Sequence, residues 1–299
     1  MNMYQQISKN KRDTAVIIVL FIAVISAIGW FLGEYYFEGS GFSLMGFALI
    51  FSGLSGVFSY YNSDKIVLSI SNAREVKFED APDLHKLVEN MSIASGIPKP
   101  RIYIIQDSSM NAFATGRDPN HSVVCFTTGI LQRLEKRELE GVIAHEMSHI
   151  GNYDIRLMSI VSILVGTIVL ISDWFTRGAL YGGSRRRNSS SGSGSGLIFL
   201  IGILFLILSP IIATLIKLAI SRNREYLADA TAASITRHPK GLADALAKLA
   251  SDSDILEAAN GATAHLFIVS PVKNFEKKVS GWFSTHPPIE ERIRRLQQM

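Results

Sequence analysis

Four apolar runs constrain this chain more strongly than any other feature of its sequence. They cover residues 14–33, 42–61, 157–175 and 197–220. A helix needs about 20 predominantly apolar residues to cross the hydrocarbon core of a bilayer, and each run is close to that length. The mean hydropathy of +0.22 is too high for an ordinary soluble enzyme. We therefore expect an integral membrane protein with about four transmembrane helices.

Charged residues beside the first two runs predict how the chain is oriented. Lys9, Lys11 and Arg12 precede the first run, the connection at 34–41 has acids but no Lys or Arg, and Lys65 follows the second run. Because Lys and Arg favour the cytoplasmic side of a membrane, the N-terminus and the segment from residue 64 are expected in the cytoplasm. The sequence has no dense basic stripe with interleaved aromatic residues, so we expect no nucleic-acid partner.

The polar segments between and after the apolar runs predict a mainly helical α+β domain. A helix is expected from about Asp80, followed by short strands at 101–106, 111–114 and 121–127. Further along, the pattern predicts helices at 222–238 and 241–251, a strand at 265–269 and a last helix from Pro288. The tract at 189–196 contains only Ser and Gly, which predicts a linker.

One segment of this domain, at 138–150, carries the pattern His-Glu-x-x-His within a good helix-forming run. On a helix, His145 and His149 lie one turn apart on the same face, so both imidazoles can reach a single cation. Glu146 lies close enough to hold a metal-bound water without being a ligand itself. Two imidazoles suit Zn²⁺, and the single cysteine, Cys125, excludes a zinc site built from cysteines. The pattern is short enough to arise by chance, so it needs support from the rest of the chain.

A catalytic zinc site needs a third protein ligand, and the best candidate is Glu225. It lies in the segment Arg-Glu-Tyr-Leu-Ala-Asp at 224–229. Asp229 is one turn further on in the expected helix, where it can accept the N–H of a zinc-bound imidazole. Alternatively, both acids belong to a solvated helix face. Asp154 follows the His-Glu-x-x-His helix and could either brace the site or cap the third apolar run.

In combination, these motifs resemble those of the HtpX-type membrane zinc metalloproteases, which are related to the CAAX prenyl proteases. The resemblance covers nearly the whole chain, including His-Glu-Met-Ser-His at 145–149, Glu-Tyr-Leu-Ala-Asp at 225–229 and Thr-His-Pro-Pro at 285–288. It implies a zincin-like cytosolic protease domain in a multi-pass protein of the bacterial plasma membrane. Residues 1–63 would then hold a cytoplasmic tail and two transmembrane helices, 157–220 a transmembrane hairpin, and 64–156 with 221–299 the catalytic domain.

The family's gluzincin arrangement implies the roles of the residues around the metal. By this resemblance His145, His149 and Glu225 bind one Zn²⁺ per chain, and Glu146 is the general base of peptide hydrolysis. Asp229 would support a metal-binding imidazole from behind.

The resemblance also implies which residues meet the substrate. Asn111, Ala112, Phe113 and Ala114 look like the family's edge strand beside the substrate. His286 and Arg292 match the spacing of a His and an Arg that lie near the scissile carbonyl, although Thr-His-Pro-Pro could simply begin the last helix. The implied substrates are polypeptides, in particular damaged or misfolded membrane proteins.

Two alternatives remain open at the level of the sequence. The first is a non-catalytic membrane adaptor that binds metal, which would leave Glu146 without a role. The second concerns residues 157–220, which either cross the bilayer twice or form a hairpin that dips into it. Pro210 and Asp173 fit the hairpin more easily, whereas the lengths of the two runs favour spanning. The oligomeric state does not follow from the sequence.

Overall fold

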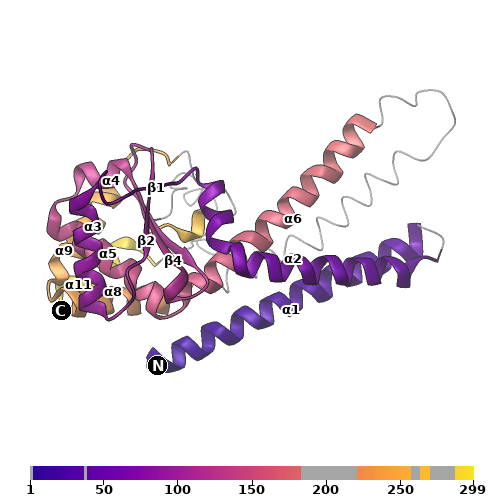
Figure 1. Ribbon diagram of the computed structural model, residues 1–299, viewed down its shortest axis with the longest axis horizontal. Helices are drawn as coiled ribbons and strands as arrows, with labels where there is room; N and C mark the ends of the chain where they lie inside the picture. Colours follow the sequence, from indigo (N-terminus) through magenta and orange to yellow (C-terminus); the bar gives the residue numbers. More distant parts are fainter. Residues whose placement is uncertain (1–2, 37–38, 183–220, 257–262, 270–286) are drawn as a thin grey trace.

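The computed structural model describes residues 3–36, 39–182, 221–256, 263–269 and 287–299. Three long helices extend away from the part of the molecule that contains the sheet (Figure 1). They are α1 (Met3–Tyr36), α2 (Gly41–Ile70) and α6 (Asp154–Gly182), and they carry the first three apolar runs. The fourth run and the Ser/Gly tract lie outside the described residues.

Two of these helices fit a membrane-spanning role. Among the described residues, Gln5–Tyr35 and Gly41–Ile70 are long and apolar enough to cross a bilayer. Large apolar side chains on α2, including Phe47, Ile50 and Leu54, are exposed, as expected of a surface that faces lipid. The described residues thus show two candidate spans, and the expected total of four is not shown.

The long helices pack against one another through apolar faces. Ile17 and Phe21 of α1 are buried with Leu157, Val161 and neighbouring apolar residues of α6. α2 continues beyond the predicted run to Ile70, with non-helical backbone at Asn62. Its last turns enter the domain, where Val67 and Leu68 are buried against the sheet. The membrane helices are therefore joined to the domain by packing as well as by the chain.

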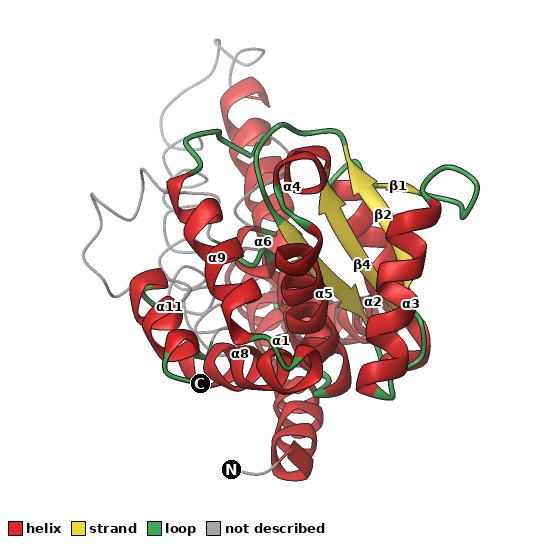
Figure 2. Cartoon of the chain, turned by 90° about the vertical axis from the view of Figure 1, so that its left-hand side faces the viewer, coloured by secondary structure: helices red, strands yellow, loops and turns green. Residues whose placement is uncertain are grey.

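The domain contains a four-stranded sheet in the order β1-β2-β4-β3 (Figure 2). The strands are β1 (Arg74–Glu75), β2 (Arg101–Ile105), β3 (Ala112–Gly116) and β4 (Ser122–Thr127). β4 runs parallel to β2 and antiparallel to β3. Because β3 is the last strand in this order, it lies at an edge of the sheet. The predictions of strands at 101–106, 111–114 and 121–127 are confirmed, although β3 begins at Ala112 and continues to Gly116.

Helices cover the sheet and fill the rest of the domain. They are α3 (Pro82–Ser95), α4 (Thr128–Arg133), α5 (Lys136–Gly151), α8 (Arg222–Thr236), α9 (Pro239–Ser251) and α11 (Ile289–Gln297). Gly96 is the C-cap of α3. Its φ of 68° lies in the left-handed region, which glycine adopts with little strain. α5 lies at the centre of the domain and packs closely on α9. A Cβ on Gly141 would lie 2.7 Å from the backbone nitrogen of Leu242, so only glycine permits this approach.

One predicted element is wrong. Residues 265–269 do not form a strand: Ala264–Leu266 is a short 3-10 helix, η3, and the chain after it is irregular. The backbone N–H of Ile268 donates one hydrogen bond to the carbonyl of Ala112 at 3.0 Å. This contact lies on the open side of β3, but a single bond does not make a ladder.

Candidate metal centre

α5 presents the His-Glu-x-x-His residues inside the protein. Glu135 and Glu138 form a capping box at its N-terminus, which satisfies backbone N–H groups that the helix leaves free. From Gly141 to Ile150 every residue of α5 is buried. His145, Glu146 and His149 are therefore held by packing on all sides, which fixes their rotamers.

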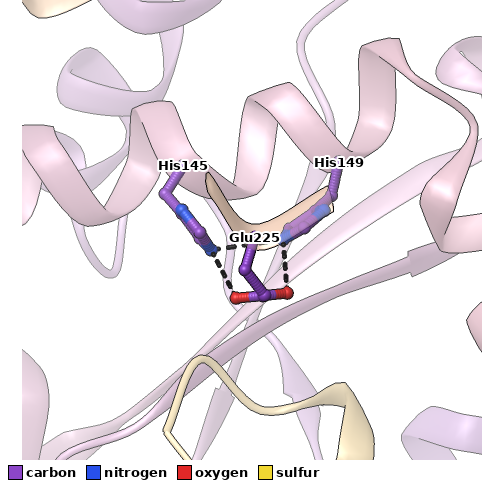
Figure 3. Close-up of side chains that lie close together, drawn as sticks. All are labelled: His145, His149 and Glu225. Carbon is purple, nitrogen blue, oxygen red and sulfur yellow. Dashed lines mark hydrogen bonds and ion pairs between the residues drawn. The ribbon is translucent and has the colours of Figure 1, made fainter. Parts of the chain in front are cut away.

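His145, His149 and Glu225 converge on one point (Figure 3). The two Nε2 atoms lie 3.2 Å apart. The Glu225 carboxylate, from the first turn of α8, faces both imidazoles, with its oxygens 3.7 Å from His145 Nε2 and 3.6 Å from His149 Nε2. All three potential ligand atoms lie within 4.8 Å of one another and all three residues are buried. Among the described residues this is the one such cluster of His, Cys, Asp and Glu.

The spacing of these atoms fits a zinc ion. Two ligands bound at the usual zinc distances with a tetrahedral angle between them are about 3.3 Å apart. The observed separations of 3.2, 3.6 and 3.7 Å are close to this value. Two imidazoles and a carboxylate are also the donor set of many catalytic zinc sites, which leave the fourth position open. The residues present therefore fit zinc.

Each imidazole is held from behind by a carboxylate. Asp229 Oδ1 lies 3.0 Å from His145 Nδ1, and Asp154 Oδ2 lies 2.9 Å from His149 Nδ1. These contacts direct both Nε2 atoms towards Glu225. A carboxylate on the second nitrogen fixes the tautomer and orientation of a metal-binding histidine. Of the two roles left open for Asp154, the structure shows bracing of His149.

Arg292 of α11 lies against the same cluster, with one guanidinium nitrogen 3.4 Å from His145 Nε2. Its side chain is buried and donates two hydrogen bonds to Asp229, at 2.8 Å and 2.7 Å, and a third to the carbonyl of Ile268 at 3.1 Å. It also lies 3.2 Å from a carboxylate oxygen of Glu225. Burial by itself would raise the pKa of the Asp229 carboxyl. The charge and hydrogen bonds of Arg292 and the contact with His145 together outweigh burial and lower this pKa to about 2.

Glu146 lies between the metal centre and the edge strand. Burial raises the pKa of its carboxyl to about 7, the charge of Glu225 adds to the rise, and His149 and Arg292 oppose it. The backbone N–H of Ala114 in β3 hydrogen-bonds the same carboxylate. A buried carboxylate with a pKa near neutrality can accept a proton in a reaction and release it again.

The two histidines differ in their surroundings. Burial lowers the pKa of His145 despite its contact with Asp229. Burial also disfavours the charged form of His149, but the hydrogen bond to Asp154 and the charge of Glu225 outweigh it and raise that pKa to about 9. A divalent cation at the three ligands would favour the neutral imidazoles.

Three of the remaining predicted site residues lie in the edge strand, and a fourth directly precedes it. Ala112, Phe113 and Ala114 begin β3, and all three are buried. Asn111 precedes the strand, and its amide donates to the carbonyl of Val269 at 2.9 Å. His286 lies outside the described residues, so the structure does not place it.

Sequence reasoning missed Asn10, whose amide donates to Asp154 at 2.6 Å. The only signal in the sequence is a polar amide in the segment that precedes the first apolar run.

A sequence profile of peptidase family M48 matches residues 79–299. The protease HtpX homologue of Dictyoglomus thermophilum is 45% identical over 296 residues, which cover 99% of this chain and 94% of that protein. The homologue of Streptococcus uberis is 43% identical over 299 residues, which cover 99% of this chain and 100% of that protein.

Among solved structures, the chain resembles the crystal structure of S. mikatae Ste24p. The TM-score is 0.50 at 18% sequence identity, and the match covers 94% of this chain. It covers 62% of that chain, so this protein spans less than two thirds of the length of Ste24p. The likeness shows a shared fold. Three findings agree: the profile match, the identity with HtpX homologues along nearly the whole chain, and the buried cluster of His145, His149 and Glu225. This chain therefore belongs to peptidase family M48, as an HtpX-type membrane zinc metalloprotease.

Proposed function

We propose that the protein is a membrane-bound endopeptidase that cleaves damaged or misfolded membrane proteins at the cytoplasmic surface. The observation that carries this proposal is the convergence of His145, His149 and Glu225 beside the buried carboxylate of Glu146. The three ligands would hold one Zn²⁺ per chain. When bound there, zinc supplies Lewis-acid polarisation and lowers the pKa of water in the open position.

Glu146 is the general base in this proposal. Its carboxylate accepts a proton from the attacking water and passes that proton to the amine of the leaving peptide. Two features of the structure support the role. The carboxylate is shielded from solvent, and its pKa of about 7 suits both halves of the transfer. The Ala114 N–H holds it beside the strand along which the substrate would lie.

The open edge of β3 is the proposed substrate site. In an antiparallel pair, alternate residues direct their N–H and C=O groups away from the partner strand. In β3 these residues include Ala112 and Ala114, because Ala112 accepts from Ile268 and Ala114 donates to Glu146 on that side. An extended peptide that replaced Ile268 at the Ala112 carbonyl would have its backbone next to the metal centre.

Arg292 and His286 are the proposed donors to the oxyanion of the transition state. The position of the Arg292 guanidinium, 3.2 Å from Glu225, supports an electrostatic role at the metal centre. A positive charge that is already in place stabilises developing negative charge without reorganisation. The sequence spacing of the family is the support for His286.

The membrane organisation is proposed in the same way. Residues 1–63 and 157–220 would form two pairs of spans, and 64–156 with 221–299 would form the cytosolic catalytic domain. Because His149 and Glu225 share one site, the chain between them must cross the bilayer an even number of times. Cysteine substitution of Ser191, in a Cys125→Ser background, tests this with an impermeant thiol reagent on intact cells. Labelling supports two crossings, and protection until the membrane is opened supports the hairpin.

The function itself is tested by metal removal and return. The purified protein, in detergent, is expected to contain one zinc per chain and to cleave casein. A chelator should abolish cleavage, and stoichiometric zinc should restore it. An adaptor that merely binds metal would give the same zinc content without cleavage. A protein with no bound zinc after purification and reconstitution would contradict the metal centre.

A further inference from the structure

The cytoplasmic end of membrane helix α1 reaches the support of the metal centre. Asn10, in the third turn of α1, is fully buried. Its amide nitrogen donates to Asp154 Oδ1 at 2.6 Å and to the carbonyl of Asn152 at 2.9 Å. The other oxygen of Asp154 accepts from His149 Nδ1 at 2.9 Å. Two hydrogen bonds therefore connect a membrane helix to a proposed metal ligand.

The hydrogen-bonding capacity of the Asn10 amide is almost fully used. Both N–H groups have acceptors, and the amide oxygen accepts from Gln6 Nε2 at 3.1 Å. Asn10 and Asp154 show no exposed surface, and Gln6 and Asn152 very little. In such a buried network, the loss of one donor leaves its partners unsatisfied and free to turn. Asp154 would then hold His149 less firmly.

The turn that carries Asp154 depends on this contact. α5 ends at Gly151, and Asn152 and Tyr153 connect it to α6. Tyr153 has a φ of 61°, which is unfavourable for a residue with a side chain and has to be stabilised by its surroundings. Next to Asn10 on α1, the Lys11 ammonium lies 4.2 Å from the centre of the Tyr153 ring. α1 thus contacts this turn at the backbone carbonyl of Asn152 and at the side chain of Tyr153.

Apolar packing keeps α1 in place for these contacts. Ile17 and Phe21 are buried against α6, about two to three turns further along α1 from Asn10. α1 therefore contacts apolar residues of α6 near Ile17 and belongs to the polar network at Asn10. If α1 separates from α6, both sets of contacts are lost together.

We propose that Asn10 is a positioning residue for the metal ligand His149, acting through Asp154. Tight metal binding then requires α1 to be packed against α6, and the site is complete only when the first membrane helix is in place. The inference rests on the proposed function, since it takes His149 to be a zinc ligand. It concerns metal affinity and not the chemical step.

The test measures the zinc dissociation constant of the full-length protein by competition with a chromophoric chelator. A Glu146→Gln background prevents self-cleavage. The variants are Asn10→Ala, Asp154→Ala and the double variant. Asn10→Ala is expected to weaken zinc binding roughly 10-fold, the lower end of the range for groups that support a ligand. Asp154→Ala should weaken it roughly 10–100-fold. The double variant should match Asp154→Ala within about twofold, because residues that act in series are not additive.

Thr14→Val is the matched control. Thr14 is also buried on α1, and its hydroxyl donates to the carbonyl of Asn10 at 2.8 Å without reaching Asp154. Its zinc affinity should equal that of the parent. Thermal unfolding in chelator reports fold stability separately from zinc binding. If Asn10→Ala does not fold, Asn10→Ser, which keeps one donor, should fold and bind zinc more weakly than the parent.

The outcomes separate this inference from the proposed function. A parent protein that binds no zinc contradicts the proposed function, and the inference falls with it. A parent that binds zinc and an Asn10→Ala variant of equal affinity contradict the inference alone. A second result would also overturn the inference, namely that Asn10→Ala lowers zinc affinity by the same factor in the parent and in the Asp154→Ala variant. Asn10 would then act through the fold and not through Asp154.

Discussion

Asp229 and Arg292 form a buried ion pair with two parallel hydrogen bonds, of 2.8 Å and 2.7 Å, directly behind His145. The pair connects α11 at the end of the chain to α8, which also carries Glu225. The sequence resemblance places Arg292 near the scissile carbonyl. In the structure its guanidinium also fixes the carboxylate that supports His145, so Arg292 acts on His145 both directly and through Asp229.

Arg292→Ala is expected to destabilise the fold as well as to lower kcat. Removal of the guanidinium leaves the buried Asp229 without a counter-charge, which costs about 3–5 kcal/mol. Arg292→Lys keeps the charge but not the two-point geometry, so it should lie between the wild type and Arg292→Ala. Chemical unfolding and kcat, measured on the same preparations, check both effects. Unchanged stability in Arg292→Ala would contradict the ion pair.

Zinc affinity should distinguish a ligand from its support. Glu225→Ala removes one of three ligands and should abolish tight zinc binding. Asp229→Asn keeps the shape but loses the charge behind His145, so affinity should fall by about 10–100-fold. The zinc dissociation constants of both variants are the measurement. A Glu225→Ala protein that binds zinc as tightly as wild type would show that another residue is the third ligand.

Asp252 should make fold stability depend on pH. It accepts hydrogen bonds from the backbone N–H of Met110 at 2.6 Å and from Arg133 at 3.0 Å. Burial acts to raise the pKa of Asp252, but these bonds and the Arg133 charge outweigh it, so the pKa is lowered. A carboxyl with a lowered folded pKa stabilises the fold above its unfolded pKa of about 4, and this contribution is lost as pH falls through the folded value.

The matching variant is Asp252→Asn. At pH 7 it should lose about 1–3 kcal/mol, because the bonds to a charged acceptor become weaker. The difference in unfolding free energy between variant and wild type should shrink as pH falls below about 4. Urea unfolding at pH 7, 5 and 3 measures this difference. A constant difference across that range would show that the Asp252 charge is not involved.

Local patterns predicted much of this fold and the first half of the site. The spacing of His145 and His149 depends only on helix periodicity, and Gly96 ends α3 because few other residues tolerate its φ. The apolar lengths of α1 and α2 likewise follow from composition. These features need no knowledge of tertiary contacts.

Long-range contacts could not be predicted in the same way. Asn10 and Asp154 are 144 residues apart, and no local pattern connects an amide in α1 to the start of α6. The Asn10 contact was not predicted, whereas the strand at 265–269 was predicted but does not form. Its residues suit a strand, but Ile268 makes only one backbone bond to β3, and η3 forms in front of it. In both cases tertiary packing decides the outcome.

The role of Glu146 as general base is tested most directly by peptide cleavage by Glu146→Gln at full zinc content. The amide is close in size to the carboxylate but cannot accept the proton of the attacking water. One zinc per chain is expected in both proteins, with a single-turnover rate at least ~100-fold lower in the variant. A smaller loss at equal zinc content would contradict the role of Glu146 as general base and, with it, the proposed mechanism.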